Sequence, residues 1–384
     1  MEKNTELLTR RVSKILPNAD DLGKLLTNKK IRLYQGFDPT GGRLHLGHTI
    51  GLRKLMEFAK AGHEVIMLFG TGTVLVGDPS LRDTARKIIT QAEIDENIKG
   101  WKKQVEKIVN FDMVTIKQNG DWLTKMTLKD IINVASNISA IQLFKRDNFT
   151  RRLGRGDTVW YHETMYPMLQ GYDSVAMDVD LEIGGTDQEF NMLVGRELQK
   201  KMNNRDKFVL ETPMILGTDG KTMSKTSGNC IFLDEPAEDM YSKLMKVQDD
   251  LVATYFELLT DIPMEEIAAL DPSKPVENKM KLAYEITRQF HGDEGARVGE
   301  TYFKTTVQTK TAPVDAPKLT IKAGTSILET LKLSDLGVSN SDIKRTLEQG
   351  GVELDGVRIT DPSTTITAGT LKFGKHTYRK VICN

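Results

Sequence analysis

The order of apolar and polar positions in the first 70 residues predicts a strand, a helix and a second strand. Residues 31–36 (IRLYQG) and 64–69 (EVIMLF) are short apolar runs of the length expected for strands. Between them, residues 48–61 carry apolar side chains at near-helical spacing, at Ile50, Leu52, Leu55, Met56 and Phe58. A strand–helix–strand unit predicts a parallel sheet, and the ligands of such sheets bind at the carboxyl ends of the strands.

Later segments extend this pattern and then replace it with helices. Residues 175–201 predict another strand (VAMDVDLEI), a loop (GGTDQ) and a helix, and residues 208–216 (FVLETPMIL) predict a further strand. Between residues 234 and 305 the apolar spacing is helical. A single buried stripe is predicted there from Met240, Leu244, Met245, Leu251, Tyr255 and Leu259.

The C-terminal end of the chain predicts a separate small unit. The segment 310–320 (KTAPVDAPKLT) is typical of a linker. Beyond it, residues 341–349 predict an amphipathic helix, the pair Gly350-Gly351 interrupts it, and residues 352–359 and 371–373 are strand-like. We therefore expect three parts, residues 1–220, 221–312 and 321–384.

Composition excludes several classes of protein. The 384 residues are too many for one ordinary core, and 39% hydrophobic with 28% charged residues is typical of a soluble globular protein. Since no apolar run reaches the roughly 18 to 20 residues that a membrane span needs, and the N-terminus lacks an apolar signal segment, we expect no membrane association. Two distant cysteines predict neither a disulfide framework nor a metal site, which favours a cytoplasmic protein. Because 53 basic and 53 acidic residues cancel, any nucleic-acid surface must be local.

The first candidate for chemistry lies where the first predicted strand ends. The segment GFDPT (36–40) is followed by HLGH (45–48) at the start of the predicted helix. A helix N-terminus offers unpaired N–H groups and a positive potential that suits anions. His45 and His48 lie on one face there and can donate hydrogen bonds to phosphoryl oxygens, while Gly47 leaves room for a flat base. Two ordinary surface histidines are the alternative, which the surrounding segment disfavours.

The second candidate is the segment GKTMSKTSGN (220–229), just after the last strand-like run of the first part. A glycine- and serine-rich loop that carries Lys221 and Lys225 can close on a triphosphate and neutralise a departing pyrophosphate. Taken alone, the loop is better explained as a basic surface turn. Its pairing with HLGH, some 175 residues upstream, favours nucleotide chemistry.

These two segments resemble the HIGH and KMSKS signatures of the class I aminoacyl-tRNA synthetases. The segments YQGFDPT (34–40), GDPS (77–80), YPMLQGYD (166–173) and GGTDQ (184–188) resemble successive motifs of the bacterial tyrosyl-tRNA synthetase family. The resemblance covers nearly the whole chain. It implies a Rossmann-like α/β catalytic domain with a parallel sheet, then a helical domain and a small α+β RNA-binding domain. It also implies a homodimer that forms through a connective segment at about 122–165.

The resemblance assigns a tyrosine pocket. Tyr34 and Asp173 hold the positions that contact the substrate phenol, and a donor and an acceptor for that hydroxyl would reject phenylalanine. Asp78, Tyr166 and Gln170 match the family's set for the substrate ammonium. Tyr166, Gln170 and Asp173 are spaced i, i+4 and i+7 and share one helix face. Plain core packing is the alternative, which is weak because Gln and Asp are rarely buried without polar partners.

The same resemblance assigns groups to ATP and to the reaction. It implies that ATP is contacted by Asp38, Gly47, Asp187, Arg82, Arg86, Lys221 and Ser224. It implies that the reacting phosphate is stabilised by Thr40, His45, His48 and Lys225. Gln188 would bind near the tyrosine carboxyl or the phosphate, and a solvated charged helix is an equal alternative for Arg82 and Arg86. Magnesium is expected to accompany the pyrophosphate, and no carboxylate cluster indicates a tightly held metal ion.

Three positions depart from the family. Thr222 replaces the first lysine of KMSKS, which leaves Lys225 as the lysine of the motif and Lys221 as a substitute one position earlier. Thr226 replaces the last serine of that motif. Gln35 stands where the family has a small residue, often cysteine, in contact with the ribose.

The C-terminal unit resembles a small RNA-binding domain that also occurs in a ribosomal small-subunit protein. The segments SDIKR (341–345) and LEQGGV (347–352) carry this resemblance. A local basic patch supplies contacts to RNA phosphates even in a neutral chain. The cations assigned to RNA are Lys344, Arg345, Lys372, Lys375, Arg379 and Lys380. A frayed basic terminus is the alternative.

The resemblance therefore implies an enzyme that activates tyrosine with ATP and then transfers it to tRNA(Tyr). The tyrosine carboxylate attacks the α-phosphorus in line, so catalysis requires positioning and charge stabilisation rather than a side-chain nucleophile. Three alternatives are a tryptophanyl enzyme, a small-substrate nucleotidyltransferase with HxGH, and a synthetase-derived RNA-binding protein. Tyr34 with Asp173 argues against the first, and residues 230–384 would be unnecessary for the second. An intact pocket argues against the third, which Thr222 keeps open.

Overall fold

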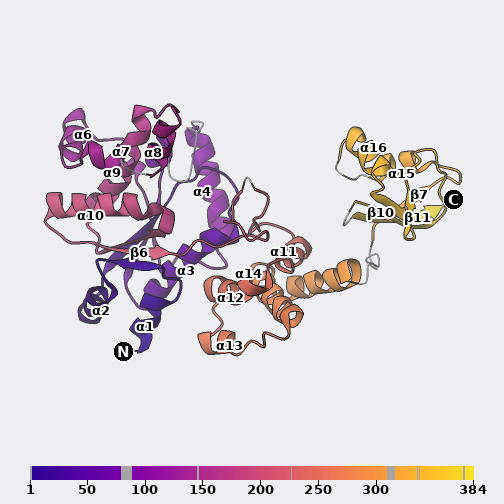
Figure 1. Cartoon of the computed structure of the whole chain (residues 1–384), viewed down its shortest axis with the longest axis horizontal. Helices are drawn as coiled ribbons and strands as arrows, with labels where there is room; N and C mark the ends of the chain where they lie inside the picture. The colour runs from indigo at the N-terminus through magenta and orange to yellow at the C-terminus, as the bar shows by residue number, and fades with distance from the viewer. Residues whose placement is uncertain are drawn as a thin grey trace. The chain divides into compact units, whose positions relative to one another are not determined.

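The computed structural model describes residues 2–78, 89–144, 147–225, 227–308, 316–334, 336, 338–374 and 377–384. The chain forms two compact units, residues 1–293 and 294–384. Each unit contains a sheet with helices packed on it (Figure 1). The grouping is coarser than the three parts expected from the sequence, because the helices up to residue 293 belong to the first unit.

The sheet of the first unit has the strand order β1-β6-β5-β2-β3-β4 among the described residues. Its strands are β1 (Lys14–Leu16), β2 (Arg32–Phe37), β3 (Glu64–Phe69), β4 (Thr115–Gln118), β5 (Leu181–Gly185) and β6 (Phe208–Thr212). Neighbouring strands are parallel except β1, which runs antiparallel to β6. The predicted α/β class with a parallel sheet is confirmed. The strand order reverses between β2 and β5, and ligands of such sheets bind beyond the carboxyl ends of the strands at that point.

The described helices of this part of the chain are α1 (Glu2–Thr9), α2 (Ala19–Asn28), α3 (Leu46–Lys60), α4 (Gln91–Val105), α5 (Gly120–Leu123), α6 (Leu128–Ala135), α7 (Ala140–Phe144), α8 (Asp147–Gly154), α9 (Tyr161–Met177) and α10 (Glu189–Asn203). Of these, α3 and α10 pack against the strands, and α9 packs on α10. The apolar side chains predicted for α3 are buried, as the helical spacing requires. Helices α9 and α10 pack closely because a Cβ on Gly171 would lie 3.0 Å from the backbone nitrogen of Gly195.

Two strand boundaries predicted from the sequence are wrong. Val175 to Met177, the start of the predicted strand, form the last turn of α9, which ends at Asp178 with φ 51°. A short apolar run fits a helix end as well as a strand, so spacing alone could not separate them. β6 stops at Thr212 because Pro213 follows and cannot donate a ladder hydrogen bond.

Helices follow β6, as predicted, and the boundary between the two units falls within the last of them. They are α11 (Ala237–Leu244), α12 (Val252–Leu259), α13 (Met264–Ala268) and α14 (Pro275–Tyr302), the last interrupted at Gly292. The buried residues Met240 and Leu244 lie on α11, and Tyr255 and Leu259 lie on α12, so they do not form one stripe. No described helix has both the length and the apolarity needed to cross a bilayer.

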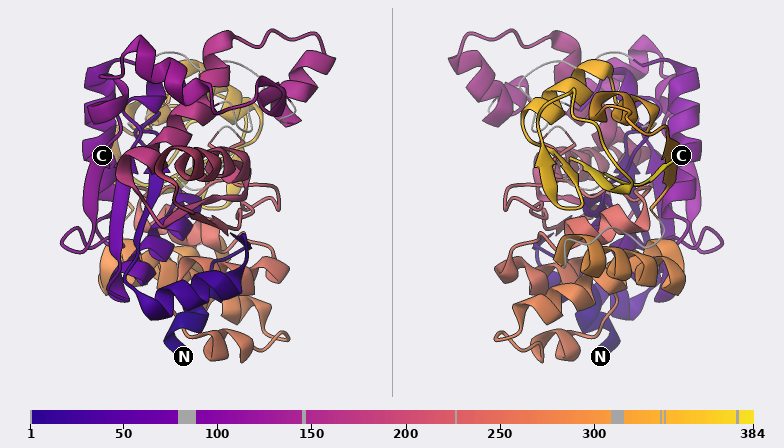
Figure 2. Two further views of the ribbon diagram at one scale, coloured as in Figure 1. Left: turned by 90° about the vertical axis from the view of Figure 1, so that its left-hand side faces the viewer. Right: turned by 90° about the vertical axis from the view of Figure 1, so that its right-hand side faces the viewer.

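The second unit is a five-stranded sheet, ordered β7-β11-β10-β8-β9 among the described residues, with helices packed against it (Figure 2). Its elements are β7 (Lys318–Ile321), α15 (Ile327–Leu333), α16 (Asn340–Glu348), β8 (Val352–Leu354), β9 (Val357–Ile359), β10 (Gly369–Phe373) and β11 (Thr377–Cys383). The predicted helix and the predicted strand at residues 371–373 are confirmed, whereas the single run predicted at residues 352–359 is two antiparallel strands, β8 and β9, joined by a turn. The predicted linker overlaps β7, and β11 was not predicted because its basic residues conceal the alternation. Residues 310–315 of that linker lie outside the described residues.

Candidate functional site

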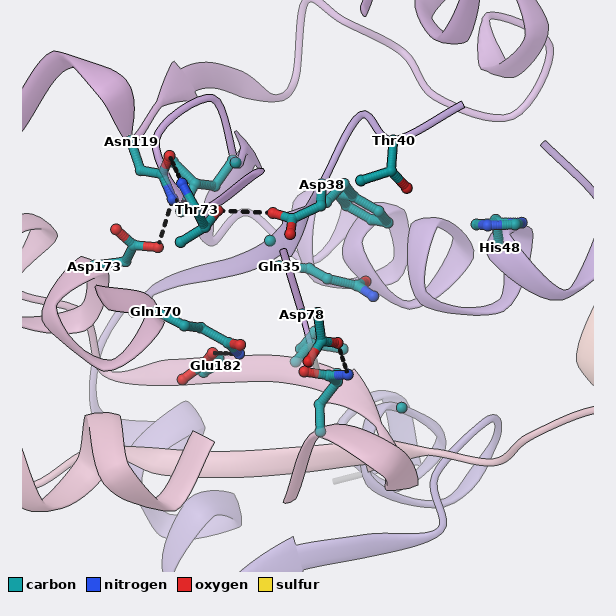
Figure 3. Close-up of a pocket in the computed structure, with 18 of the residues that line it drawn as sticks. Gln35, Asp38, Thr40, His48, Thr73, Asp78, Asn119, Gln170, Asp173 and Glu182 are labelled. Carbon is teal, nitrogen blue, oxygen red and sulfur yellow. Dashed lines mark hydrogen bonds between the residues drawn. The ribbon is translucent and has the colours of Figure 1, made fainter. Parts of the chain in front are cut away.

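A cavity lies where the strand order reverses, beyond the carboxyl ends of β2 and β5 (Figure 3). The strand ends and the loops that follow them line one part of it, and helices α3 and α9 line another. Its polar lining includes Gln35, Asp38, Thr40, His48, Thr73, Asp78, Trp101, Asn119, Tyr166, Gln170, Asp173, Glu182, Gln188 and Lys225. In the view of Figure 3, Asp173 and Gln170 lie on one side of the pocket and His48 on the other.

One end of the cavity is built around Asp173. Asn119 Nδ2 donates to its Oδ2 at 3.0 Å, and Trp122 Nε1 donates to its Oδ1 at 2.9 Å. Burial raises the pKa of Asp173 well above its usual range, and these donated hydrogen bonds oppose the shift. The carboxyl group therefore sits in a dry, ordered place where it can bind one further polar group.

Tyr34 does not line this cavity. Its side chain is completely buried, and its hydroxyl lies 2.9 Å from Ser174 Oγ. Burial, reinforced by the neighbouring carboxylates, raises the pKa of Tyr34 well above its ordinary value. The structure therefore does not bring Tyr34 and Asp173 together at one open position, and the assignment of Tyr34 to a substrate phenol stays a prediction.

The residues predicted for the ammonium are brought together. Asp78, Tyr166 and Gln170 all line the cavity. The Tyr166 hydroxyl donates to Asp38 Oδ2 at 3.0 Å, and Asp78 accepts a hydrogen bond from Gln188 Nε2 at 2.9 Å. With Asp38, Asp173 and Glu182, these groups place carboxyl oxygens around one space, which suits a cation.

Thr73 and Asn119 hold one wall of the cavity in place, the wall that runs from Asp38 to Asp173. Thr73 Oγ1 donates to Asp38 Oδ1 at 2.7 Å, and Asn119 Nδ2 donates to Thr73 Oγ1 at 3.1 Å. Asn119 also accepts a hydrogen bond from the backbone nitrogen of Gly72 at 2.7 Å. Because Asn119 reaches Asp173 as well, one side chain links the Asp38 and Asp173 ends of the wall. No motif in the sequence places Thr73 or Asn119 here, because neither stands in a segment that carries the family resemblance.

The two histidines of HLGH lie at the N-terminus of α3, as predicted. Their ring centroids are 3.9 Å apart, and His48 Nδ1 lies 3.1 Å from the backbone nitrogen of His45. Burial, helped by the charge of Lys225, lowers the pKa of His45 to about 4. Burial also lowers the pKa of His48 well below its usual range. Both rings are therefore neutral near pH 7 and act as hydrogen-bonding groups, of which His48 lines the cavity.

Gly47 has a packing role in this structure. A Cβ there would lie 3.0 Å from His45 Cε1 and 3.3 Å from Ile215 Cγ2. Gly47 is not among the residues that line the cavity, so its predicted contact with a base stays a prediction.

The loop from residue 217 to residue 229 carries Lys225 to the cavity. Asn229 organises this loop: its Oδ1 accepts from the backbone nitrogen of Ser224 at 2.9 Å, and its Nδ2 donates to Asp219 at 2.8 Å. Lys221 is exposed and does not line the cavity, whereas Lys225 does. Sequence reasoning gave no role to Asn229, although it ends the glycine- and serine-rich segment.

The remaining residues predicted for ATP and for the reacting phosphate differ in whether they line the cavity. Asp187 lies in a short helical turn after β5 and accepts a hydrogen bond from Gln188 Nε2 at 2.8 Å, but it is not among the lining residues. Thr40 lines the cavity. Arg82 and Arg86 lie outside the described residues. Across the part of the chain that the structure describes, no group of three or more His, Cys, Asp or Glu is placed to hold a metal ion.

The cations assigned to RNA differ in their surroundings. Lys344 and Lys380 are exposed. Arg345 is exposed and pairs with Asp342 at 2.5 Å. The other two described residues have partners inside the unit, since Lys372 pairs with Glu353 at 3.3 Å and Arg379 Nε donates to the Ser334 carbonyl oxygen at 3.0 Å. Lys375 lies outside the described residues.

Comparison with known proteins gives one consistent family. Residues 26–308 match the family model described as "tRNA synthetases class I (W and Y)". The tyrosine–tRNA ligase of Thermotoga maritima is 38% identical over 390 aligned residues, which cover 99% of this chain and 97% of that protein. Tyrosine–tRNA ligase 2 of Vibrio cholerae is 38% identical, with 97% of each chain covered.

Solved structures share the fold. A C-terminally truncated mitochondrial tyrosyl-tRNA synthetase of Aspergillus nidulans superposes with a TM-score of 0.65 at 21% identity, covering 79% of this chain and 97% of that chain. The tyrosyl-tRNA synthetase of Archaeoglobus fulgidus, solved with L-tyrosine, has a TM-score of 0.63 at 22% identity and covers 78% and 99%.

Proposed function

The chain belongs to the class I tRNA synthetase family of the W and Y type, and on that premise we propose that its cavity performs the tyrosine–tRNA ligase reaction. The enzyme activates tyrosine with ATP and then transfers it to the 3′ end of tRNA(Tyr). Relatives named tyrosine–tRNA ligase, 37–38% identical over nearly the whole chain, favour tyrosine over tryptophan. The observation that carries the proposal is a single cavity with carboxyl groups at one end and neutral or cationic donors at the other. A tyrosyl-adenylate has a cation and a phosphate at matching positions.

Tyrosine would bind at the acidic end. Asp173 offers a buried carboxyl group to the phenol, held by Asn119 and Trp122. The substrate ammonium would lie among Asp78, the Tyr166 hydroxyl and Gln170. Such a site rejects phenylalanine because its buried polar groups would be left unpaired.

Chemistry would occur between the two ends. A tyrosine carboxylate oxygen forms a bond to the α-phosphorus of ATP, while the bond from that phosphorus to the bridging oxygen breaks and pyrophosphate leaves. Thr40, the neutral His48 ring and the N-terminus of α3 would donate to the phosphoryl oxygens, with His45 holding His48 in place. Lys225 would neutralise the leaving pyrophosphate. Positioned donors of this kind stabilise charge that develops only in the transition state.

ATP would bind through the groups that surround this centre. We assign the ribose to Asp187, with Gln188 near the carboxyl or the phosphate, and we keep Gly47, Lys221 and Ser224 as further contacts. Asp38 is already engaged with Thr73 and Tyr166, so it would act by holding those side chains.

Magnesium would arrive with the phosphates. The described side chains near the predicted phosphate end are Thr40, His48 and Lys225, which are neutral or cationic and do not fit an all-protein magnesium site. Magnesium keeps water ligands and commonly binds substrate phosphates, so the phosphates themselves would hold it.

The second unit would bind tRNA. Lys344, Arg345 and Lys380 are exposed on it and would contact phosphates, while Lys372 and Arg379 would first have to leave partners inside the unit. Tyrosine, ATP and tRNA meet in the cytoplasm, and we propose that compartment.

A homodimer would form through the segment 122–165. Large apolar side chains are exposed there, and clustered exposed apolar residues mark interaction surfaces. Their exposed fractions are 74% for Leu128, 59% for Ile132, 68% for Ile141, 57% for Trp160 and 82% for Tyr161. Sedimentation of the wild type and of a variant with Leu128 and Ile141 changed to Ser tests this, since a wild-type monomer would contradict it.

ATP–pyrophosphate exchange with each of the twenty amino acids tests the activity. Exchange should depend on tyrosine, and charging should follow with tRNA(Tyr). Exchange that depends on tryptophan would reassign the substrate. The absence of exchange with any amino acid would favour a small-substrate nucleotidyltransferase or an RNA-binding protein.

A further inference from the structure

A buried ion pair lies directly behind the substrate cavity. Glu182 on β5 and Lys207, the residue before β6, form a salt bridge with side-chain exposures of 2% and 0%. Glu182 also lines the cavity, and sequence reasoning missed both residues. The available signal was Glu182 between Leu181 and Ile183 in a predicted buried strand, because acidic residues are rarely buried without a partner. Burying two charges costs free energy, so a buried ion pair is weak evidence for stability and suggests another role.

Both carboxylate oxygens of Glu182 are engaged. Oε2 accepts hydrogen bonds from Lys207 Nζ and, at 3.4 Å, from Ser174 Oγ. Lys207 Nζ also donates to Ser174 Oγ at 2.8 Å, which fixes the pair from a second side. Oε1 accepts a hydrogen bond from Gln170 Nε2 at 3.2 Å. Glu182 therefore faces the cavity with its oxygens already bound to protein groups.

The hydrogen bond between Gln170 and Glu182 sets the orientation of the Gln170 amide. A carboxylate only accepts hydrogen bonds, so it holds the amide nitrogen of Gln170 and disfavours the opposite orientation, in which two oxygens would meet. That orientation leaves Gln170 Oε1 as the free acceptor. Within the described residues Oε1 is buried and has no hydrogen-bond partner, and Gln170 lines the cavity. A buried acceptor without a partner is costly unless a ligand supplies the donor.

We propose that Glu182 is a positioning residue that fixes the Gln170 amide with Oε1 toward the substrate ammonium, and that Lys207 holds Glu182 in this orientation. This inference rests on the proposed function, since the ammonium belongs to the amino acid substrate. It makes the oxygen of Gln170, not the charge of Glu182, the group that the ammonium contacts.

The variant Glu182→Gln tests this arrangement, because it should reverse the orientation of the Gln170 amide. Lys207 can only donate, so it would bind the oxygen of the new amide and turn the new NH2 group toward Gln170. The Gln170 amide would then reverse and present its own NH2 group to the ammonium. Adding Lys207→Met removes the group that enforces this orientation, so it should restore part of the binding.

Two ligands separate a positioning role from a purely structural one. Tyrosinol carries the ammonium, and 3-(4-hydroxyphenyl)-1-propanol is the same molecule without it. Dissociation constants for both are measured by calorimetry on the full-length chain. Glu182→Gln should raise the dissociation constant of tyrosinol by roughly tenfold to a hundredfold, the range that corresponds to one hydrogen bond to a charged group. It should change the dissociation constant of the propanol by less than about twofold. Equal weakening of both ligands would overturn the proposal in favour of a structural role.

The background variant Gln170→Ala separates positioning from direct attraction. If Glu182 acts through Gln170, Glu182→Gln should have no further effect on tyrosinol in that background, whereas a direct electrostatic role would persist. Persistence would overturn the proposal, as would failure of Lys207→Met to restore any tyrosinol binding to Glu182→Gln. Thermal unfolding of each variant checks that it is folded. A wild type that binds no tyrosinol and shows no tyrosine-dependent exchange would reject the proposed function itself.

Discussion

The hydroxyl of Tyr34 lies 2.9 Å from Ser174 Oγ, inside the network that joins Lys207 and Glu182 rather than in the open cavity. Both side chains are fully buried. Asp173, the other residue predicted for the substrate phenol, does line the cavity. Of the two residues predicted to contact the phenol, only Asp173 is therefore placed to reach a ligand in the cavity, and substitutions at the two positions should differ in their effect on substrate choice.

Asp173→Asn should narrow the preference for tyrosine over phenylalanine more than Tyr34→Phe does. Losing one neutral hydrogen bond costs about 0.5–1.5 kcal/mol, and a bond to a charged group costs about 1.5–3 kcal/mol. The measurement is kcat/KM for both amino acids in pyrophosphate exchange. A larger loss of discrimination in Tyr34→Phe would mean that the Tyr34 hydroxyl leaves Ser174 when tyrosine binds.

Lys225→Ala should slow adenylate formation by about 10²–10³, the usual cost of one positioned transition-state donor, and barely change tyrosine affinity. Lys221→Ala is the comparison and should slow the step less, because Lys221 lies on the same loop as a proposed ATP contact but does not line the cavity. Single-turnover rates and equilibrium tyrosine binding separate the two effects. If Lys221→Ala is as slow as Lys225→Ala, Lys221 has replaced the lysine missing at Thr222.

Protonation of His45 should not lower the rate of adenylate formation between pH 8 and pH 6. The pKa of His45 is lowered to about 4, mainly by burial, so the neutral ring persists through this range. The folded state resists a proton that the unfolded chain binds at its ordinary pKa of 6.5. This residue therefore costs stability as pH falls below 6.5, and the ring charges only near pH 4. A rate profile with a limb near 6.5 that disappears in His45→Asn would contradict this.

Gly51→Ala should impair substrate binding through Gln35. A Cβ at Gly51 on α3 would lie 2.2 Å from Gln35 Oε1, so the Gln35 amide must swing away, and Gln35 lines the cavity. Displacing a side chain from its rotamer costs about 0.5–1.5 kcal/mol, which corresponds to a KM for ATP raised roughly twofold to tenfold. In the Gln35→Ala background, Gly51→Ala should therefore cause no further rise in the KM for ATP. A further rise would mean that the defect comes from α3 itself.

The features predicted correctly from the sequence are those that depend on the residues of one short segment alone. β3 has the predicted limits because a buried parallel strand is a continuous apolar run, and the helix after β2 follows from its own spacing. The motif residues Asp78, Gln170 and Lys225 line one cavity because ligands of such sheets bind where the strand order reverses, and loops and helices around that point converge on it.

Sequence reasoning failed where the signal depends on distant partners. Glu182 and Lys207 are 25 residues apart, and their pairing exists only because β5 and β6 are neighbours in the sheet. The same holds for Asn119, whose partners Thr73 and Asp173 lie 46 and 54 residues away in the chain. The direction of the Tyr34 hydroxyl likewise depends on Ser174 of α9, which no local pattern predicts.

A chain that ends near residue 311 should still exchange pyrophosphate at close to the full-length rate. All described cavity residues lie at or before Lys225, and the buried core of the C-terminal sheet, from Ile321 to Val381, is drawn from residues beyond the cut. Charging of tRNA should fall, because Lys344 and Lys380 would be lost. The full-length advantage should shrink as salt rises, since phosphate contacts release counterions and binding weakens with salt. The full-length and the shortened chain are both assayed for exchange, and for charging at low and moderate salt. Loss of exchange on truncation would make the unit part of the catalytic fold, and unchanged charging would show that it does not anchor tRNA.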